Sequence, residues 1–224
     1  MGLESRDFEF FIKEKVERWK QIQAAEKKGE KHISVVTISS EPGSGGQLVA
    51  REVAEKLGFD LFERGIVQKI AESVHVRDTV INSMEKTRLS GIEDFLSSLV
   101  NDRYLWPGLY LEHLMKVIGV IGKHGRAVIV GRGANFIIPQ DEALSVRLVA
   151  PLDVRVQHIA KAYDISPRAA KKRVMNRGSQ RRAFCRQSYN ANIADPCNYD
   201  LTINTTRMNI DTAVRTICVA LDRR

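Results

Sequence analysis

Cysteines, long apolar runs and aromatic residues are all scarce in this sequence, and each shortage excludes a class of protein. The 224 residues include three cysteines, Cys185, Cys197 and Cys218, and none belongs to a CxxC pair. A disulfide framework and a zinc site are therefore not expected, and a reducing cytoplasm is the expected location. No apolar run approaches the roughly 20 residues that span a bilayer, so we expect no membrane partner.

Aromatic side chains account for 7% of the residues, and few of them lie among the basic ones. Proteins that bind single-stranded nucleic acid stack bases on such side chains, so a nucleic-acid partner is disfavoured. Hydrophobic residues at 43% and charged residues at 28% are ordinary for a globular protein and exclude intrinsic disorder. With this length, they predict one α/β domain with insertions.

The net charge of +8 lies in one segment of the chain. Residues 168–186 contain no Asp or Glu and eight basic residues, which are Arg168, Lys171, Lys172, Arg173, Arg177, Arg181, Arg182 and Arg186. The rest of the chain carries as many basic as acidic residues. A local basic segment suits a nucleotide polyphosphate, a nucleic-acid backbone or an anionic surface, and charge alone does not choose among them.

Buried strands alternate with helices along most of the chain. Strands are predicted over residues 32–39, 59–62, 127–130, 144–150 and 199–204. Helices are predicted from residue 48 to a C-cap at Gly58, over 64–75, from about 153, from an N-cap at Ser166, and over 210–222. Residues 77–124 are predicted to be mostly helical, with breaks near Gly91 and at Pro107. This alternation predicts a parallel sheet covered by helices on both faces.

The N-terminal segment predicts an amphipathic helix over residues 5–28. Its apolar positions are Phe8, Phe11, Ile12, Val16, Trp19 and Ile22. A short linker follows at 27–31, so we divide the chain into an N-terminal part, 1–31, and a main domain, 32–224. We expect the apolar face to pack on the main domain or on a second copy of the chain, which would then form a homo-oligomer.

A glycine-rich turn, Glu41 to Gly46, joins the first predicted strand to a helix. Such a turn points backbone N–H groups and a helix N-terminus at an anion. The dinucleotide pattern GxGxxG fails because Leu48 replaces its third glycine, and the P-loop pattern GxxxxGK[ST] fails at Gly46 and Gln47. Three glycines within four residues favour close approach of a ligand to the backbone. The alternative is a turn that only joins strand to helix.

Four segments, taken in order, resemble the cytidylate kinase-like family of P-loop phosphotransferases. They are ISSEPGSGGQLVAREVAEKLGFDLFERGIV, VIVGRGANFII, VRLVAPLDVRVQHI and RRAFCRQSYNANIADPCNYDLTINT. That family is similar to bacterial CMP kinase and typically has a GSGG turn in place of the lysine-bearing loop. The resemblance covers roughly residues 33–220. It implies a P-loop NTPase-like α/β fold of about five parallel strands, a helical insertion on the acceptor side at about 77–124, and a basic helical lid at about 166–190.

The resemblance implies an ATP-dependent nucleoside monophosphate kinase that acts on CMP or dCMP with Mg²⁺. The donor phosphates would be bound through the turn by Gly43, Ser44, Gly45, Gly46 and Gln47. Phosphoryl transfer needs positioning and cations at the γ-phosphoryl oxygens, and basic lid residues would supply them. The catalytic candidates from the lid are Arg177, Arg181 and Arg186. Family members commonly have an acidic residue and a lysine where this chain has Gly178 and Ser179.

Two further residues would form the acceptor side. Arg132 follows the strand 127–130, and the resemblance implies that it binds the acceptor monophosphate; its alternative is a surface ion pair. Glu63 ends the second strand, and the resemblance implies that it stands at the family's usual Asp position, near the acceptor and the metal; its alternative is an acid that the macrodipole favours at a helix N-terminus. The metal ligands are unknown.

Other functional classes stay open at this point. The missing lysine and the missing Ser or Thr favour, as the main alternative, a regulatory protein that binds a nucleotide without turnover. A nucleic-acid-binding module ranks third because of the basic segment. A nucleotide-dependent dehydrogenase ranks last because its glycine pattern fails.

Overall fold

The computed structural model describes residues 5–25, 34–103, 105 and 107–223. A parallel sheet lies at its centre, and in the described residues it has five strands in the order β2-β3-β1-β4-β5. The strands are β1 (Val35–Ser40), β2 (Asp60–Phe62), β3 (Ala127–Val130), β4 (Leu144–Val149) and β5 (Leu201–Asn204). The predicted fold class, a P-loop NTPase-like parallel sheet, is confirmed.

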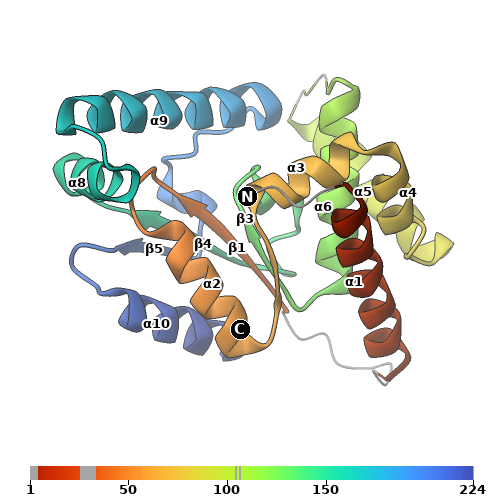
Figure 1. Cartoon of the computed structure of the whole chain (residues 1–224). Coiled ribbons are helices and arrows are strands. Elements are labelled where there is room, and N and C mark those ends of the chain that lie inside the picture. The colour runs from red at the N-terminus through yellow and green to blue at the C-terminus, as the bar shows by residue number, and fades with distance from the viewer. Residues whose placement is uncertain (1–4, 26–33, 104, 106, 224) are drawn as a thin grey trace.

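Helices cover both faces of the sheet (Figure 1). One face packs on α2 (Gly46–Leu57) and α10 (Ile210–Asp222), with Val36 and Ile38 of β1 in that core. The other face, with Val35, packs on α3 (Arg64–Glu72) and α6 (Leu109–His124). Successive strand residues point to opposite faces, so an apolar run such as β1 serves both cores. None of the helices in the described residues is long and apolar enough to span a membrane.

The helical stretch after β2 is broken at places other than those predicted. The predicted helix 64–75 ends at Glu72, and Ser73, which is extended, separates it from α4 (Val74–Ile81). The predicted break near Gly91 is wrong, because α5 (Lys86–Asp102) runs through it. A glycine costs a helix about 1 kcal/mol, and here the burial of Ile92 and Leu96 outweighs that cost. The break at Pro107 is confirmed, since α6 begins at Leu109.

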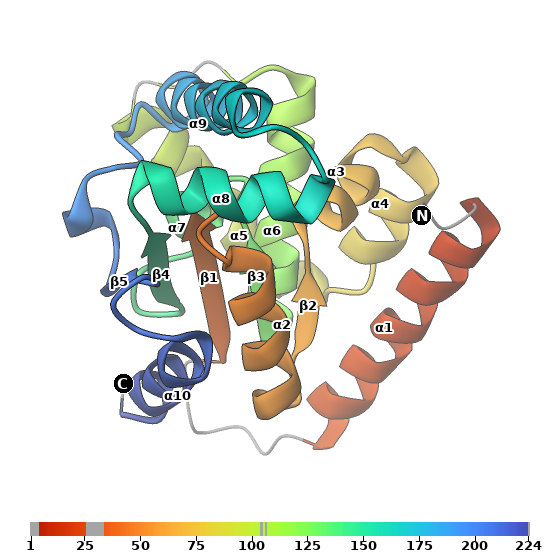
Figure 2. The ribbon, with the colours of Figure 1, turned by 60° about the vertical axis from the view of Figure 1, so that its left-hand side comes forward.

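Two helices lie across the carboxyl edge of the sheet, α8 (Leu152–Tyr163) and α9 (Pro167–Tyr189) (Figure 2). The predicted lid falls on α9. Ser166 is its N-cap, as predicted, and accepts a hydrogen bond from the Ala169 N–H over 3.3 Å. Asp164 precedes α9 and Asn190 follows it, and both have a positive φ. The short helices α7 (Ala134–Ile137) and η1 (Pro196–Asn198) complete the described elements.

The N-terminal helix α1 (Ser5–Ala25) packs on its own chain (Figure 1). Phe8, Ile12, Val16 and Trp19 are buried in the core that also contains α6. Lys15 donates a hydrogen bond to the buried carboxylate of Asp60 over 2.7 Å. The Ile22 side chain and the predicted linker lie outside the described residues. Self-association through α1 stays a prediction, and it would use the outer side of the helix, where Phe10 is exposed.

Candidate functional site

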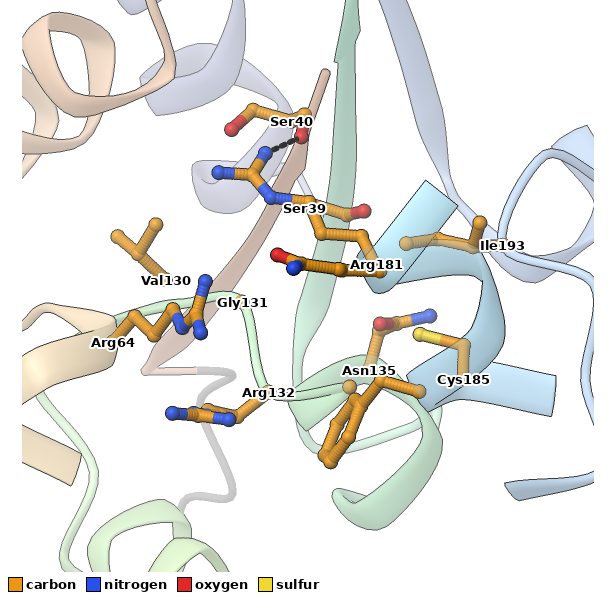
Figure 3. A pocket seen from close by; sticks show the side chains of 13 residues that line it. Ser39, Ser40, Arg64, Val130, Gly131, Arg132, Asn135, Arg181, Cys185 and Ile193 are labelled. Atoms are coloured by element: carbon orange, nitrogen blue, oxygen red, sulfur yellow. Dashed lines mark hydrogen bonds between the residues drawn. The ribbon is translucent and has the colours of Figure 1, made fainter. Parts of the chain in front are cut away.

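A cavity of about 270 Å³ lies at the carboxyl ends of β1 and β3, beneath α9 (Figure 3). Its wall comes from the end of β1, the start of α3, the end of β3 with the loop and α7 that follow it, α9, and Ile193 beyond α9. The residues used below are Ser39, Ser40, Arg64, Gly131, Arg132, Gly133, Arg181, Phe184 and Cys185. Three of the lining residues are arginines, and no described lining residue is Asp or Glu. Ligands of open α/β sheets bind at this edge, and this one is strongly cationic.

Arg132 has a strained backbone that aims it at this cavity. Its φ is 55°, between Gly131 at 74° and Gly133 at 67°, so three consecutive residues are left-handed. For a residue with a side chain this conformation is uncommon and is often kept at functional sites. A Cβ at Gly133 would lie under 3.0 Å from the Tyr189 ring, and the Tyr189 hydroxyl donates to the Arg132 carbonyl over 2.6 Å. The end of α9 therefore holds this loop in place.

The Arg132 side chain is only partly satisfied by the protein. Its Nη2 donates to Gln68 Oε1, while its Nε is buried and finds no hydrogen-bond partner in the described part of the chain. Burial lowers the pKa of Arg132, and the ring of Phe184 lies 5.6 Å from the guanidinium carbon. Arg64 lies nearby in the same cavity (Figure 3). A half-buried cation with a free donor suits an anionic ligand.

Arg181 reaches the glycine-rich loop from α9. Its Nη1 donates to the backbone carbonyl of Ser40, the last residue of β1 (Figure 3). Burial, together with the neighbouring cations Arg64, Arg177 and Arg147, lowers the pKa of Arg181 to about 10. Arg181 therefore stays charged at neutral pH, and no carboxylate of the described residues forms an ion pair with it.

Arg147 was not predicted from the sequence. It lies in β4 and is 7% exposed, with Nη1 3.1 Å from Ser39 Oγ and the guanidinium 5.5 Å from the ring centre of Tyr199. Within the described part of the chain, no carboxylate pairs with it. A charged residue within the buried strand LSVRLVA was the available signal, because arginine is rarely buried without a role.

The loop itself is organised by hydrogen bonds within the chain. Ser44 is fully buried, and its Oγ lies 2.9 Å from Glu41 O and 3.1 Å from Leu148 O. Gly45 is the N-cap residue of α2 with a φ of 78°, and α2 has no side-chain cap. The first N–H groups of α2 are thus left for water or for a ligand.

Packing explains two of the three glycines. A Cβ at Gly43 would lie 2.5 Å from Arg155 O, and a Cβ at Gly46 would lie under 3.0 Å from the Ser40 side chain. The number of glycines is therefore no sign of a ligand by itself, which corrects that step of the sequence argument. Binding of phosphate by Gly43, Ser44, Gly45, Gly46 and Gln47 stays a prediction.

Helix α8 covers the loop through two residues that the sequence did not single out. Arg155 Nε lies 3.3 Å from Glu41 Oε2 and donates to Ala150 O over 2.8 Å. His158 Nδ1 lies 2.9 Å from Gly43 O. Only the tertiary structure brings α8 to this loop, so spacing along the chain gave no signal.

Glu63 lies beside the start of α2 and is not part of the cavity wall. Gln47 Nε2 is 3.4 Å from Glu63 Oε2, and Arg51 Nη2 is 3.9 Å from Glu63 Oε1. Among the described residues, no group of three or more His, Cys, Asp or Glu side chains is placed to hold a metal ion. The structure therefore brings Glu63 to the predicted donor loop, and its acceptor role stays a prediction.

The three lid arginines do not converge. Arg177 lies one turn before Arg181 and is 3.5 Å from Tyr163 Oη. Arg186 is exposed and lines a separate hollow with Arg182 and Ala183. Five residues along a helix correspond to a rotation of about 140°, so Arg181 and Arg186 point to different sides of α9.

Comparisons with known proteins identify the family of this chain. Residues 35–207 match the model of the cytidylate kinase-like family. A cytidylate kinase of Ignicoccus hospitalis is 28% identical over 186 residues, which cover 83% of this chain and 97% of that protein. A cytidylate kinase of Pyrococcus horikoshii is 27% identical over 84% of this chain and 88% of its own.

A crystal structure of an uncharacterized protein from Eubacterium ventriosum has the same fold. It is 20% identical, with a TM-score of 0.65, over 87% of this chain and 100% of the other. The family match spans the sheet, the loop, the left-handed turn of Arg132 and the whole of α9. The chain therefore belongs to the cytidylate kinase-like family.

Proposed function

We propose that the protein is an ATP-dependent kinase that phosphorylates a nucleoside monophosphate, CMP or dCMP. The observation that carries this proposal is the cavity at the carboxyl edge of the sheet, which three arginines and no carboxylate of the described residues line. A phosphate group neutralises such a cluster, and the family membership gives the reaction class. The likeness to named cytidylate kinases supports the cytidine base.

On the acceptor side, Arg132 is proposed to bind the monophosphate. Its planar guanidinium offers two parallel donors, and its Nε has no hydrogen-bond partner among the described residues. The left-handed turn and Tyr189 fix its position before the ligand arrives, which lowers the entropy cost of binding. Arg64, from α3, is proposed to add a second positive charge in the same cavity.

On the donor side, the loop and the uncapped start of α2 are proposed to bind the ATP phosphates through backbone N–H groups. Mg²⁺ bound to ATP would neutralise charge on the β- and γ-phosphates. Glu63 and Gln47 lie together at this end of α2, and carboxylate and amide oxygens are ligands that Mg²⁺ accepts. These two residues are therefore the proposed protein contacts of the metal. Of the three predicted lid arginines, Arg177 and Arg181 remain the proposed catalytic cations. Arg186 is exposed and lines a separate hollow, so the proposal leaves it out.

A coupled assay of ADP release tests the function. ATP, Mg²⁺ and a panel of nucleoside monophosphates are supplied, with non-nucleotide hydroxyl compounds as further acceptors. We expect turnover with CMP or dCMP and none without an acceptor. Measurable ATP binding without turnover on any acceptor would favour the regulatory alternative that the missing lysine and Ser or Thr suggest.

A further inference from the structure

Position 46 of the loop has no room for a side chain. In the P-loop pattern a lysine stands where this chain has Gly46. A Cβ at this position would lie under 3.0 Å from both Oγ and Cβ of Ser40, whereas the Cα of Ser40 is 3.9 Å away, an ordinary contact. The side chain of Ser40 alone therefore excludes a lysine from the loop.

The same Ser40 binds a cation from elsewhere. Its carbonyl oxygen accepts a hydrogen bond from Arg181 Nη1, so a guanidinium from α9 lies against the first residue of the loop pattern. Figure 3 shows the Arg181 guanidinium beside Ser40 at this end of β1. The loop therefore has no room for the lysine of the P-loop pattern, and it contacts the guanidinium of Arg181 instead.

The charge of Arg181 is not balanced by a carboxylate of the described residues. Its charged neighbours are Arg64, Arg147 and Arg177, and no carboxylate of the described residues pairs with it. By contrast, Arg155, the other arginine at the loop, lies 3.3 Å from the Glu41 carboxylate. A buried cation without a counter-charge is costly, and a bound anion removes that cost.

We propose that Arg181 takes over the role of the missing loop lysine and stabilises the negative charge of the phosphates that the loop binds. This inference rests on the proposed kinase function. The contact of Ser40 with Gly46 and the contact of Ser40 with Arg181 are then two parts of one replacement. An arginine presents two donors in one plane, so it serves a phosphate at least as well as a lysine does.

The replacement is tested by reversing it. Arg181→Ala is expected to lower kcat at least about tenfold, since cations at the transferring phosphoryl group carry much of the rate. Ser40→Gly and Gly46→Lys are then added to Arg181→Ala, which creates room in the loop and returns a cation to it. We expect the kcat of this triple variant to be at least about tenfold higher than that of Arg181→Ala alone. The matched control adds Ser40→Gly and Gly46→Met, which has similar length and no charge, and should restore nothing.

Equal rescue by the lysine and methionine variants would overturn the inference, as would wild-type kcat in Arg181→Ala. Circular dichroism and thermal melting check that each variant folds. If the loop variants do not fold, Arg181→Lys and Arg181→Met in the intact loop decide. The kcat of the lysine variant should then exceed the kcat of the methionine variant by more than about tenfold.

Failure of the proposed function gives a different result. If the wild-type protein phosphorylates no acceptor, the inference is judged by calorimetric titration with Mg²⁺–ATP. Arg181→Ala should then weaken binding at least about tenfold, and the Ser40→Gly, Gly46→Lys pair should restore it. Unchanged affinity in Arg181→Ala would overturn the inference in that case.

Discussion

At the scale of single residues, the site is marked by arginines without carboxylate partners. Arg132, Arg147 and Arg181 are buried or half-buried, and none forms an ion pair with a described Asp or Glu. By contrast, Lys15 is paired with Asp60 and Arg155 with Glu41. Buried charge is tolerated where a ligand completes it, so these three arginines are the candidates for contact with an anionic ligand.

Arg132→Lys tests whether Arg132 acts on the acceptor or on ATP. A lysine keeps the charge but loses the planar fork, so we expect the acceptor KM to rise at least about tenfold while the ATP KM changes little. Steady-state kinetics with each substrate varied in turn measures this. Arg215→Lys on α10, where the arginine pairs with Asp211, is the matched surface control. Equal effects of Arg132→Lys on both KM values would place Arg132 at the donor or in a structural role.

Tyr189→Phe tests how the left-handed turn is held. The change removes the hydroxyl that donates to the Arg132 carbonyl and leaves the ring that packs against Gly133. A buried carbonyl without its donor costs about 1–3 kcal/mol of stability. We further expect the acceptor KM to rise several-fold, with the ATP KM unchanged. A loss of stability without a change in the acceptor KM would mean that Tyr189 only supports the fold.

At the scale of elements, α2 and α9 approach the carboxyl edge of the sheet with different surfaces. The start of α2 presents backbone N–H groups, which are partial positive charges fixed by the helix. Helix α9 presents guanidinium groups, which are full charges on long side chains. Its C-terminal end is fixed to the acceptor loop through Tyr189, and Arg103 Nη1 also donates to Tyr189 O over 3.0 Å.

Position 45 tests the anion site at α2. Valine is unsuitable there because Gly45 has a φ of 78°, which a β-branched residue rarely adopts. Asn and Asp tolerate this conformation and have the same shape, and either requires the Ile210 side chain, 3.2 Å from the added Cβ, to shift slightly. We expect Gly45→Asp to bind ATP at least about tenfold more weakly than Gly45→Asn, by calorimetry. Equal affinities would remove the loop from the phosphate site.

Arg181 and Arg186 lie on different sides of α9, so the effects of their substitution on kcat can be compared. Arg186 is exposed and lies away from the cavity, so Arg186→Ala should keep kcat within about twofold of the wild type. Arg181→Ala should not, for the reason given above. A loss in Arg186→Ala as large as that in Arg181→Ala would show that α9 turns during the reaction. Both variants should melt near the wild-type temperature.

At the scale of the whole molecule, α1 is part of the core that supports the sheet. Trp19 stacks on His124 of α6 at 4.3 Å between ring centres, and Asp60 of β2 binds Lys15 and Arg18. The N-terminal helix thus covers the β2 side of the fold, at the opposite side of the sheet from β5. Its apolar face is used within the chain.

His124 makes the stability of this contact depend on pH. Burial under Trp19, together with Arg88, lowers the pKa of His124 from 6.5 to about 4. Between these values the unfolded chain binds the proton and the folded chain does not. The contribution is therefore complete above about pH 6.5 and is lost towards pH 4, by up to about 3 kcal/mol. Urea unfolding across this range measures it.

His124→Gln is the control for that measurement. The amide keeps a polar group near Ser83 Oγ, which lies 2.8 Å from His124 Nε2, and it does not titrate. The free energy of unfolding of the variant should fall less steeply between pH 6.5 and pH 4. Identical slopes in both proteins would assign the acid sensitivity to other groups.

The sequence by itself determined the architecture. Alternation of apolar strands and amphipathic helices predicted all five strands of the described sheet within about three residues, and Ser166 and Gly58 marked helix ends as predicted. These features depend on local spacing and on backbone conformation, which neighbouring residues specify. Four ordered segments predicted the family by resemblance, and the family match confirms it. Arg132 was singled out because it follows a buried strand, and its role stays a prediction.

Only the tertiary structure decided which groups meet. Arg147 and Arg181 are brought to β1 from β4 and α9, and the side chain of Ser40 fills the place of a loop lysine because β1 and α2 meet at that point. Gly91 does not break α5, because residues on either side of it pack on α6. Contacts between segments far apart in the chain depend on packing of the whole fold. Residue spacing therefore carries no record of them.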